Sequence, residues 1–193
     1  LPYIESVRQL KWELGEGNSM VIHLTLLPYL ASSGELKTKP SQHSVRLLME
    51  SGIQADVLVC RTEHKMTKEI RAKLAQFCNV AYENVIESID LETIYEVPLY
   101  LQKQNFDEVV LKELNLPLGK ESDLKDWNNF LKKYKNPKRT VEIALVGKYV
   151  SLQDSYKSIA EAFIHAGASM ETEVKVRWVY SGEITEENVE ETF

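Results

Sequence analysis

The residues best suited to chemistry lie in one short segment, Gly34 to His43, with the one-letter sequence GELKTKPSQH. It follows an apolar run that predicts a buried strand, and it leads into the predicted start of a helix. Ligands of open parallel sheets bind at such loops, and a helix amino terminus offers free N–H groups and a favourable dipole to anions. With the two cations Lys37 and Lys39, the segment predicts a phosphate site. The alternative is a solvated, lysine-containing loop that caps the helix.

A second candidate is Lys73, on a predicted helix that starts at Thr67 and runs to about Phe77. At about 100° per residue, Lys73 projects into the apolar stripe of this helix rather than opposite it. The stripe consists of Met66, Ile70, Leu74 and Phe77. A lysine there must extend its charge to solvent or meet an anion, because an unpaired buried charge is costly. The sequence leaves both interpretations open.

Other reactive residue types are interpreted as structural. Neither Cys60 nor Cys78 lies in a nucleophile elbow, so both are predicted to be buried core thiols. His23 lies within an apolar strand and is expected to be a hydrogen-bonded core histidine. The pair Gly147 and Lys148 lacks the spaced glycines of a phosphate loop, and the sequence contains no G-x-x-x-x-G-K-[ST] motif.

Composition narrows the function classes. The chain has 193 residues, 44% hydrophobic and 27% charged, which excludes a disordered chain. No run approaches the roughly 20 apolar residues of a membrane span. A net charge of −6 argues against a general nucleic-acid binder. Two cysteines favour a reducing compartment, and hence the cytoplasm, while the spacing of the four histidines indicates no transition-metal site.

Strands and helices alternate in the first part of the chain. Residues 19–26 form a nearly continuous apolar run, as expected of a strand buried on both faces. A helix at 40–51, a strand at 55–60, the helix from Thr67 and a strand at 84–88 follow. This βαβαβ rhythm predicts an α/β fold with a mostly parallel sheet and flanking helices.

A second domain is expected later in the chain. Residues 120–139 carry many charges around sparse apolar residues and predict an amphipathic linker helix. A buried strand at 140–149, a helix at 154–166 and a strand at 174–180 then read as the opening βαβ of another α/β domain. Because helical patterns begin at Leu1 and run up to Phe193, we expect a segment of a longer protein.

Five segments together resemble the CTP synthase family. They are LPYIESVRQ at 1–9, HLTLLPY at 23–29, GELKTKPSQHSV at 34–45, IYEVP at 94–98 and VGKY at 146–149. They occur in the order and spacing of the family, so the resemblance covers essentially the whole chain. The motif K-T-K-P-[ST]-Q-H-S is highly specific.

The resemblance implies domains and a reaction. Residues 1–119 would be the carboxyl-terminal part of a P-loop-like amidoligase domain, 120–139 a linker helix, and 140–193 the start of a class I glutamine amidotransferase domain. In the family, ATP phosphorylates O4 of UTP and ammonia from glutamine displaces the phosphate, giving CTP. Mg²⁺ accompanies the nucleotides, GTP activates, and CTP inhibits at the UTP triphosphate site. A cytoplasmic homotetramer, with filament formation open, would have no nucleic-acid or membrane partner.

Site residues follow from the resemblance, position by position. The UTP and CTP triphosphate would be bound by Lys37, Thr38, Lys39, Pro40, Ser41, Gln42 and Lys73. The segment Ile89, Asp90 and Leu91 matches a contact to the adenine of ATP. Tyr156 and Lys157 match the region near the domain interface and GTP.

The resemblance also implies what these residues lack. The glycine-rich ATP loop and the Mg²⁺ ligands of the family precede Leu1, and its amidotransferase cysteine follows Phe193. No catalytic residue is therefore expected here, and the 193-residue chain alone is predicted to be inactive. Two alternatives stay open: a non-catalytic nucleotide-sensing or assembly module of the same ancestry, and another ATP-dependent ligase with the same sheet architecture.

Overall fold

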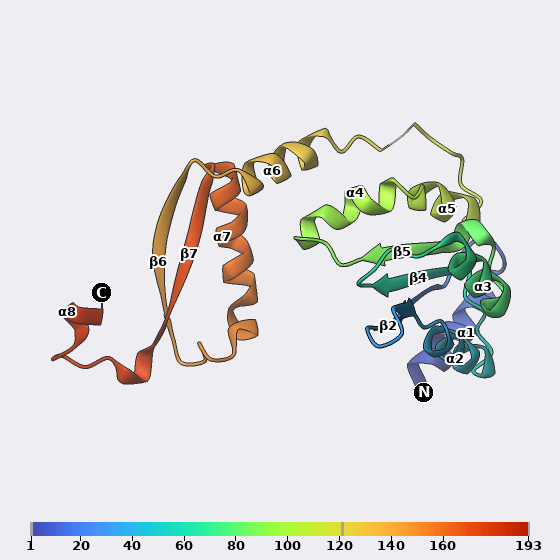
Figure 1. Ribbon diagram of the computed structural model, residues 1–193, viewed down its shortest axis with the longest axis horizontal. Helices are drawn as coiled ribbons and strands as arrows, with labels where there is room; N and C mark the ends of the chain where they lie inside the picture. Colours follow the sequence, from blue (N-terminus) through green and yellow to red (C-terminus); the bar gives the residue numbers. More distant parts are fainter. Residues whose placement is uncertain (1, 121, 193) are drawn as a thin grey trace. The chain divides into compact units, whose positions relative to one another are not determined.

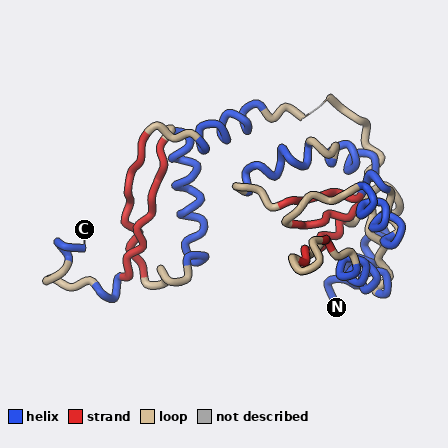
Figure 2. Tube along the Cα trace, in the orientation of Figure 1, coloured by secondary structure: helices blue, strands red, loops and turns tan. Residues whose placement is uncertain are grey.

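The computed structural model describes residues 2–120 and 122–192, which form two compact units, Leu1–Ser122 and Asp123–Phe193. Each unit contains a parallel sheet flanked by helices, as Figures 1 and 2 show, which confirms the predicted α/β fold class. The boundary between the units falls within the segment 120–139 that the sequence predicts as a linker. The three predicted domain ranges themselves stay a prediction.

The sheet of the first unit consists of three parallel strands in the order β1-β4-β5. These strands are β1 (Ile22–Leu26), β4 (Val57–Thr62) and β5 (Val85–Ile89). Helix α2 (Lys39–Glu50) connects β1 to β4, and α3 (Lys68–Cys78) connects β4 to β5. The βαβαβ rhythm of the sequence is thereby confirmed, with element ends within about three residues of those predicted.

Local sequence signals set the ends of these helices. Pro40 lies in the first turn of α2, where a missing N–H costs nothing, and Gly52 follows the helix with φ of 80°. The Thr67 hydroxyl accepts a hydrogen bond from the Ile70 N–H at 3.3 Å, which caps α3. Asn79 ends α3 in the left-handed conformation with φ of 53°. Capping and turn residues therefore determine where α2 and α3 stop.

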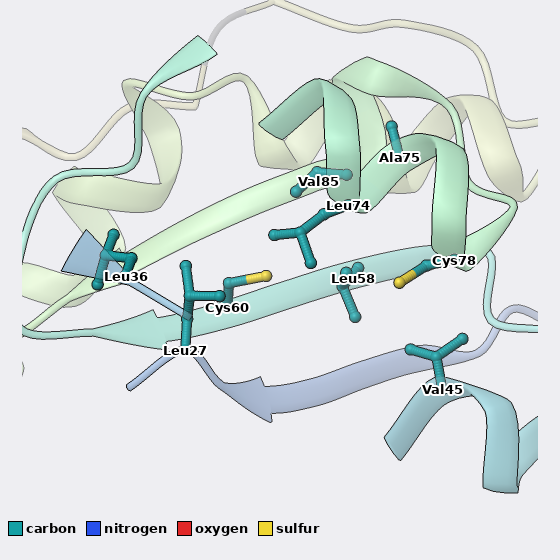
Figure 3. Close-up of a cluster of buried hydrophobic side chains, with 9 residues drawn as sticks. All are labelled: Leu27, Leu36, Val45, Leu58, Cys60, Leu74, Ala75, Cys78 and Val85. Carbon is teal, nitrogen blue, oxygen red and sulfur yellow. The ribbon is translucent and has the colours of Figure 1, made fainter. Parts of the chain in front are cut away.

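Both faces of β4 and β5 are covered by helices. On one face, a buried cluster joins the strands to α2 and α3; Figure 3 shows it, with Leu74 of α3 lying over Leu58 of β4. Its members are Leu27, Leu36, Val45, Leu58, Cys60, Leu74, Ala75, Cys78 and Val85. On the other face, Val57 and Ile86 pack against Val109 of α5. This alternation along β4 is the period-two pattern of a strand buried on both sides.

Strand β1 is different, and the prediction that it is buried on both faces is wrong. It lies at one edge of the three-stranded sheet, where Leu24 and Leu26 are 61% and 62% exposed. Its other face carries His23 and the buried Thr25, and α2 packs there. An apolar run of five residues does not distinguish a central strand from an edge strand, because both have the same composition.

The remaining elements of the first unit are short or peripheral. They are α1 (Pro2–Leu14), the antiparallel pair β2 (Tyr29–Leu30) and β3 (Glu35–Leu36), η1 (Tyr82–Asn84), η2 (Ile94–Glu96), α4 (Val97–Gln102) and α5 (Phe106–Glu113). The β2–β3 turn requires Gly34, which has φ of 65° and donates its N–H to the Leu30 carbonyl at 2.8 Å. This hairpin leads directly into the candidate phosphate segment.

The second unit is a βαβ unit with an additional helix. Strands β6 (Arg139–Gly147) and β7 (Thr172–Tyr180) are parallel, and Figure 1 shows α7 (Lys157–Ser169) along one face of them. Helix α6 (Lys125–Lys135) packs against α7, where the Phe130 and His165 rings stack with centroids 5.3 Å apart. The short elements are η3 (Gln153–Tyr156), η4 (Ser181–Glu183) and α8 (Val189–Thr192). The βαβ pattern predicted after residue 140 is confirmed.

Candidate functional site

The candidate residues of the first unit follow the carboxyl ends of its strands. Parallel neighbours end at the same edge of a sheet, and ligands of open α/β sheets bind outside that edge. Residues 37–42 follow β1 through the β2–β3 hairpin, Lys73 lies on the helix after β4, and residues 89–91 follow β5. The topology therefore brings the segment 37–42 and the segment 89–91 to the carboxyl-terminal end of the sheet.

The segment 37–42 separates its charges from its hydroxyls. Thr38 and Ser41 are 6% and 0% exposed, whereas Lys37 is partly exposed and Lys39 is exposed. The Ser41 hydroxyl donates to the Leu26 carbonyl at 2.9 Å, and the Gln42 amide donates to Thr38 Oγ1 at 3.0 Å. The Ser41 hydroxyl thus ties the start of α2 to the end of β1, while the exposed Lys39 remains accessible to a ligand.

Glu35 links the two separately predicted lysine features. Its carboxylate forms an ion pair with Lys37, and a hydrogen bond from Lys37 is the main cause that lowers the pKa of Glu35. The charge of Lys73 on α3 also lowers this pKa, although it is the weakest contributor. Leu36 and Leu74, the chain neighbours of these groups, belong to the same buried cluster. Lys37 is therefore the direct partner of Glu35, and Lys73 acts on it only weakly.

Lys73 itself does not lie in the apolar stripe, so this part of the sequence interpretation is wrong. The buried residues of α3 are Leu74, Ala75 and Cys78, whereas Lys73 is exposed and Phe77 is 58% exposed. The stripe is rotated by one residue relative to the predicted one, because Ala75 and Cys78 rather than Phe77 face the sheet. Lys73 consequently needs no anion to offset burial, and its case rests on its proximity to Glu35.

The segment 89–91 lines a pocket of about 560 Å³ at the end of β5. The lining residues are Arg61, Ser88, Ile89, Asp90, Leu91, Thr93, Ile94 and Val97. Arg61 Nη2 lies 3.1 Å from Asp90 Oδ1, an ion pair whose side chains are 59% and 54% exposed. All three residues predicted to contact ATP are thus brought together in one pocket, with a cation beside them.

A buried polar network supports β5. The Glu87 carboxylate, on a residue that is 7% exposed, accepts hydrogen bonds from the Met66 N–H and from the Tyr100 hydroxyl. Burial first, and then the hydrogen bond to Glu87, raises the pKa of Tyr100. Gln104 bonds the Glu87 backbone at both its N–H and its carbonyl, and Arg71 of α3 donates to the Val85 carbonyl at 2.6 Å. The network ties α3 to the strand that ends at the pocket.

The structural interpretations of the other reactive residues are confirmed. Burial raises the pKa of the Cys60 thiol to about 12 and that of the Cys78 thiol to about 11, so neither is a nucleophile. His23 is hydrogen-bonded to the Ser44 hydroxyl at 2.9 Å, and burial lowers its pKa. Gly147 has a packing role, because a Cβ there would lie 2.1 Å from the Tyr156 hydroxyl oxygen. Lys157 is paired with Glu161 at 2.9 Å.

Residues 2–120 and 122–192 contain neither a metal-binding cluster nor a membrane-spanning helix. No three or more His, Cys, Asp or Glu residues gather there in a way that could hold a metal ion. No helix within these ranges is both long and apolar enough to cross a bilayer. The described residues therefore supply no complete ligand set for Mg²⁺.

Two residues of the site were not identified from the sequence as site residues. Glu35 lies in the hairpin strand β3, and Lys37 directly follows this strand, two positions along the chain from Glu35. This local signal could have indicated the ion pair. Arg61 lies 29 positions from Asp90, and only the parallel pairing of β4 with β5, with Arg61 opposite Ser88, brings the two together. No local pattern reports such a contact.

Comparison with known proteins gives consistent results. A family model described as CTP synthase N-terminus matches residues 1–116. A CTP synthase of Flavobacterium johnsoniae is 65% identical over 191 residues, covering 99% of this chain and 36% of that protein. CTP synthases of Christiangramia forsetii and Caldanaerobacter subterraneus subsp. tengcongensis are 60% and 53% identical, over 98% and 99% of this chain. The chain spans 35% of the length of each of those two relatives.

Proposed function

The chain belongs to the CTP synthase family, and on that premise we propose that it is part of an enzyme that converts UTP to CTP. The reaction consumes ATP and takes its nitrogen from glutamine or ammonia. One observation supports the assignment of the site: Lys37 and Lys39 of the KTKPSQ segment lie between the carboxyl end of β1 and the first turn of α2, and Lys39 is exposed. A triphosphate is the nucleotide group that such a set of cations recognises.

In this proposal the segment 37–42 and Lys73 bind the triphosphate shared by UTP and CTP. Lys37, Lys39 and Lys73 contribute as point charges, which tolerate a flexible polyphosphate better than a rigid guanidinium fork would. Thr38 and Ser41 hold the segment in place through their buried hydrogen bonds, while Pro40 and Gln42 shape the first turn of α2. Because product and substrate share this group, CTP competes with UTP and inhibits the enzyme.

The pocket after β5 is proposed to take the adenosine of ATP. Its volume of about 560 Å³ is in the range typical of small-molecule sites. The side chains of Ile89 and Leu91 offer apolar surface to a base. Arg61 adds a cation near the same mouth. Two nucleotides would thus bind at the carboxyl-terminal end of the sheet.

Further partners are proposed from the family alone. Glutamine as nitrogen donor, GTP as activator, a homotetrameric assembly and a cytoplasmic location all follow from the resemblance, which leaves filament formation open. Mg²⁺ would accompany the nucleotides, bound through their phosphates and through carboxylates other than those of the described residues. The region of Tyr156 and Lys157 is the proposed approach of GTP.

The experiment that tests the site is a competition titration. CTP, UTP and ATP are titrated calorimetrically into the 193-residue chain, singly and in pairs. UTP should displace CTP, because the two share the triphosphate site, and ATP should bind without displacing either. Displacement of CTP by ATP at stoichiometric occupancy would contradict the assignment of two separate regions. A module that only senses nucleotides would give the same titration, so CTP formation by the enzyme decides between the two functions.

A further inference from the structure

Glu35 occupies an unusual position for a residue of an anion site. Glu35 lies in β3 and Lys37 directly follows this strand, while Leu36 between them is 8% exposed and belongs to the buried cluster. The carboxylate of Glu35 lies beside the ammonium group of Lys37 and forms an ion pair with it. A negative charge is thus built into the segment that is proposed to bind a still more negative ligand.

A second cation, Lys73, acts weakly on the same carboxylate, since its charge is the smallest of the causes that lower the pKa of Glu35. Leu36 and Leu74, the chain neighbours of Glu35 and Lys73, belong to one buried cluster (Figure 3). The lowered pKa of Glu35, caused first by Lys37 and in smaller part by Lys73, agrees with this geometry. At neutral pH the carboxylate is consequently ionised and neutralises Lys37.

We propose that Glu35 is an affinity-determining residue of this site, an internal anion that neutralises Lys37 and must release it when a triphosphate binds. This inference rests on the proposed triphosphate site and adds a role for a residue that the site itself does not require. A tethered carboxylate competes at a fixed, high effective concentration. Glu35 therefore raises the dissociation constant of any polyphosphate that engages Lys37.

The alternative explanation for any effect of Glu35 is general repulsion, and charge-matched variants separate the two. Glu50 lies at the far end of α2, about 16 Å from Lys39 at 1.5 Å per residue, and pairs with Arg46 at 3.2 Å. That distance is about twice the Debye length of about 8 Å in physiological salt. Glu50→Gln changes the net charge by the same amount as Glu35→Gln, without touching the lysines.

The experiment measures binding of CTP and of inorganic tripolyphosphate to the 193-residue chain by calorimetry at fixed salt. Glu35→Gln should tighten both ligands by about twofold to fivefold, the range expected from freeing an exposed ion pair. Glu50→Gln should leave both affinities unchanged. In a Lys37→Met background the tightening by Glu35→Gln should vanish, because no lysine is then released. Glu35→Asp, with a shorter reach, should give a partial effect.

The outcomes separate the inference from its premise. If neither ligand binds the parent chain or any variant, the proposed triphosphate site is wrong and the role of Glu35 falls with it. If the parent binds, Lys39→Ala weakens binding, and Glu35→Gln leaves affinity unchanged or lower, only the role of Glu35 is overturned. Tightening that persists in the Lys37→Met background also overturns it, because general repulsion would then suffice. Melting curves of each variant check that the fold is retained.

Discussion

The segment after β1 and the pocket after β5 both lie at the carboxyl-terminal end of one parallel sheet, yet they present different kinds of surface to a ligand. Residues 37–42 carry two lysines: Lys39 is exposed and, within the described part of the chain, forms no ion pair, whereas Lys37 is paired with Glu35. Residues 89–91 line a pocket whose cation, Arg61, is balanced by Asp90 at 3.1 Å. We therefore propose that recognition in the first region depends on charge and in the second mainly on shape.

This difference predicts how the two regions respond to substitution. Exposed charges contribute little to the stability of a fold, so their removal should change affinity for one nucleotide and leave the melting temperature nearly unchanged. Substitutions in the core beneath these charges should instead lower the melting temperature. Substitutions in the core and at the exposed charges therefore test the two sides of the comparison separately.

The largest effect is expected beneath the charged region, at Leu74. This side chain is fully buried in the cluster that also contains Leu36. Leu74→Ala should lower the free energy of unfolding by about 2–5 kcal/mol, measured by urea denaturation, because it removes buried surface and leaves a cavity. Phe77→Ala on the same helix is the control, since Phe77 is 58% exposed and should cost far less. If Leu74→Ala and Phe77→Ala lowered the free energy of unfolding equally, Phe77 would belong to the apolar stripe, as predicted from the sequence.

The next effect is a loss of affinity at Lys39, which is exposed and forms no ion pair with any residue that the structure describes. Lys39→Ala should weaken UTP and CTP together by roughly tenfold to a hundredfold, because a charge-assisted contact contributes about 1.5–3 kcal/mol. ATP affinity should change much less. Titration of all three nucleotides checks this, and a collapse of ATP affinity with intact UTP affinity would reassign the segment to the other nucleotide.

The same contrast explains what could be predicted from the sequence. Helix ends and the phosphate segment depend on local signals, namely Pro40, Gly52 and Thr67, whose chemistry acts within a few residues. Whether β1 is an edge strand depends on its neighbours in space, which its composition does not report. The predicted face of Lys73 is wrong by one position, because the small side chains of Ala75 and Cys78, rather than the large Phe77, face the sheet.

A smaller effect is expected at Lys73, whose only sign of a role is its charge near Glu35. Lys73→Met keeps most of the stem and removes the charge, so the melting temperature of the ligand-free chain should hardly change. The extra stabilisation by CTP should shrink by about 1 kcal/mol for a fivefold weaker dissociation constant, because it follows RT ln(1 + [L]/Kd). Melting curves with and without CTP at one concentration measure this. An undiminished shift would leave residues 37–42 as the whole triphosphate site.

The smallest effect is expected in the pocket, where shape dominates. Arg61→Met should weaken ATP by no more than about fivefold and leave CTP unchanged, since the cation is half exposed and partly neutralised by Asp90. Arg46→Met is a matched control, because Arg46 forms a similarly exposed pair with Glu50 at 3.2 Å and lines neither region. A loss of ATP affinity well beyond fivefold at Arg61 alone would show that charge governs the pocket as well. Both regions would then recognise their ligand through a cation that a carboxylate of the chain partly neutralises, Lys37 by Glu35 and Arg61 by Asp90.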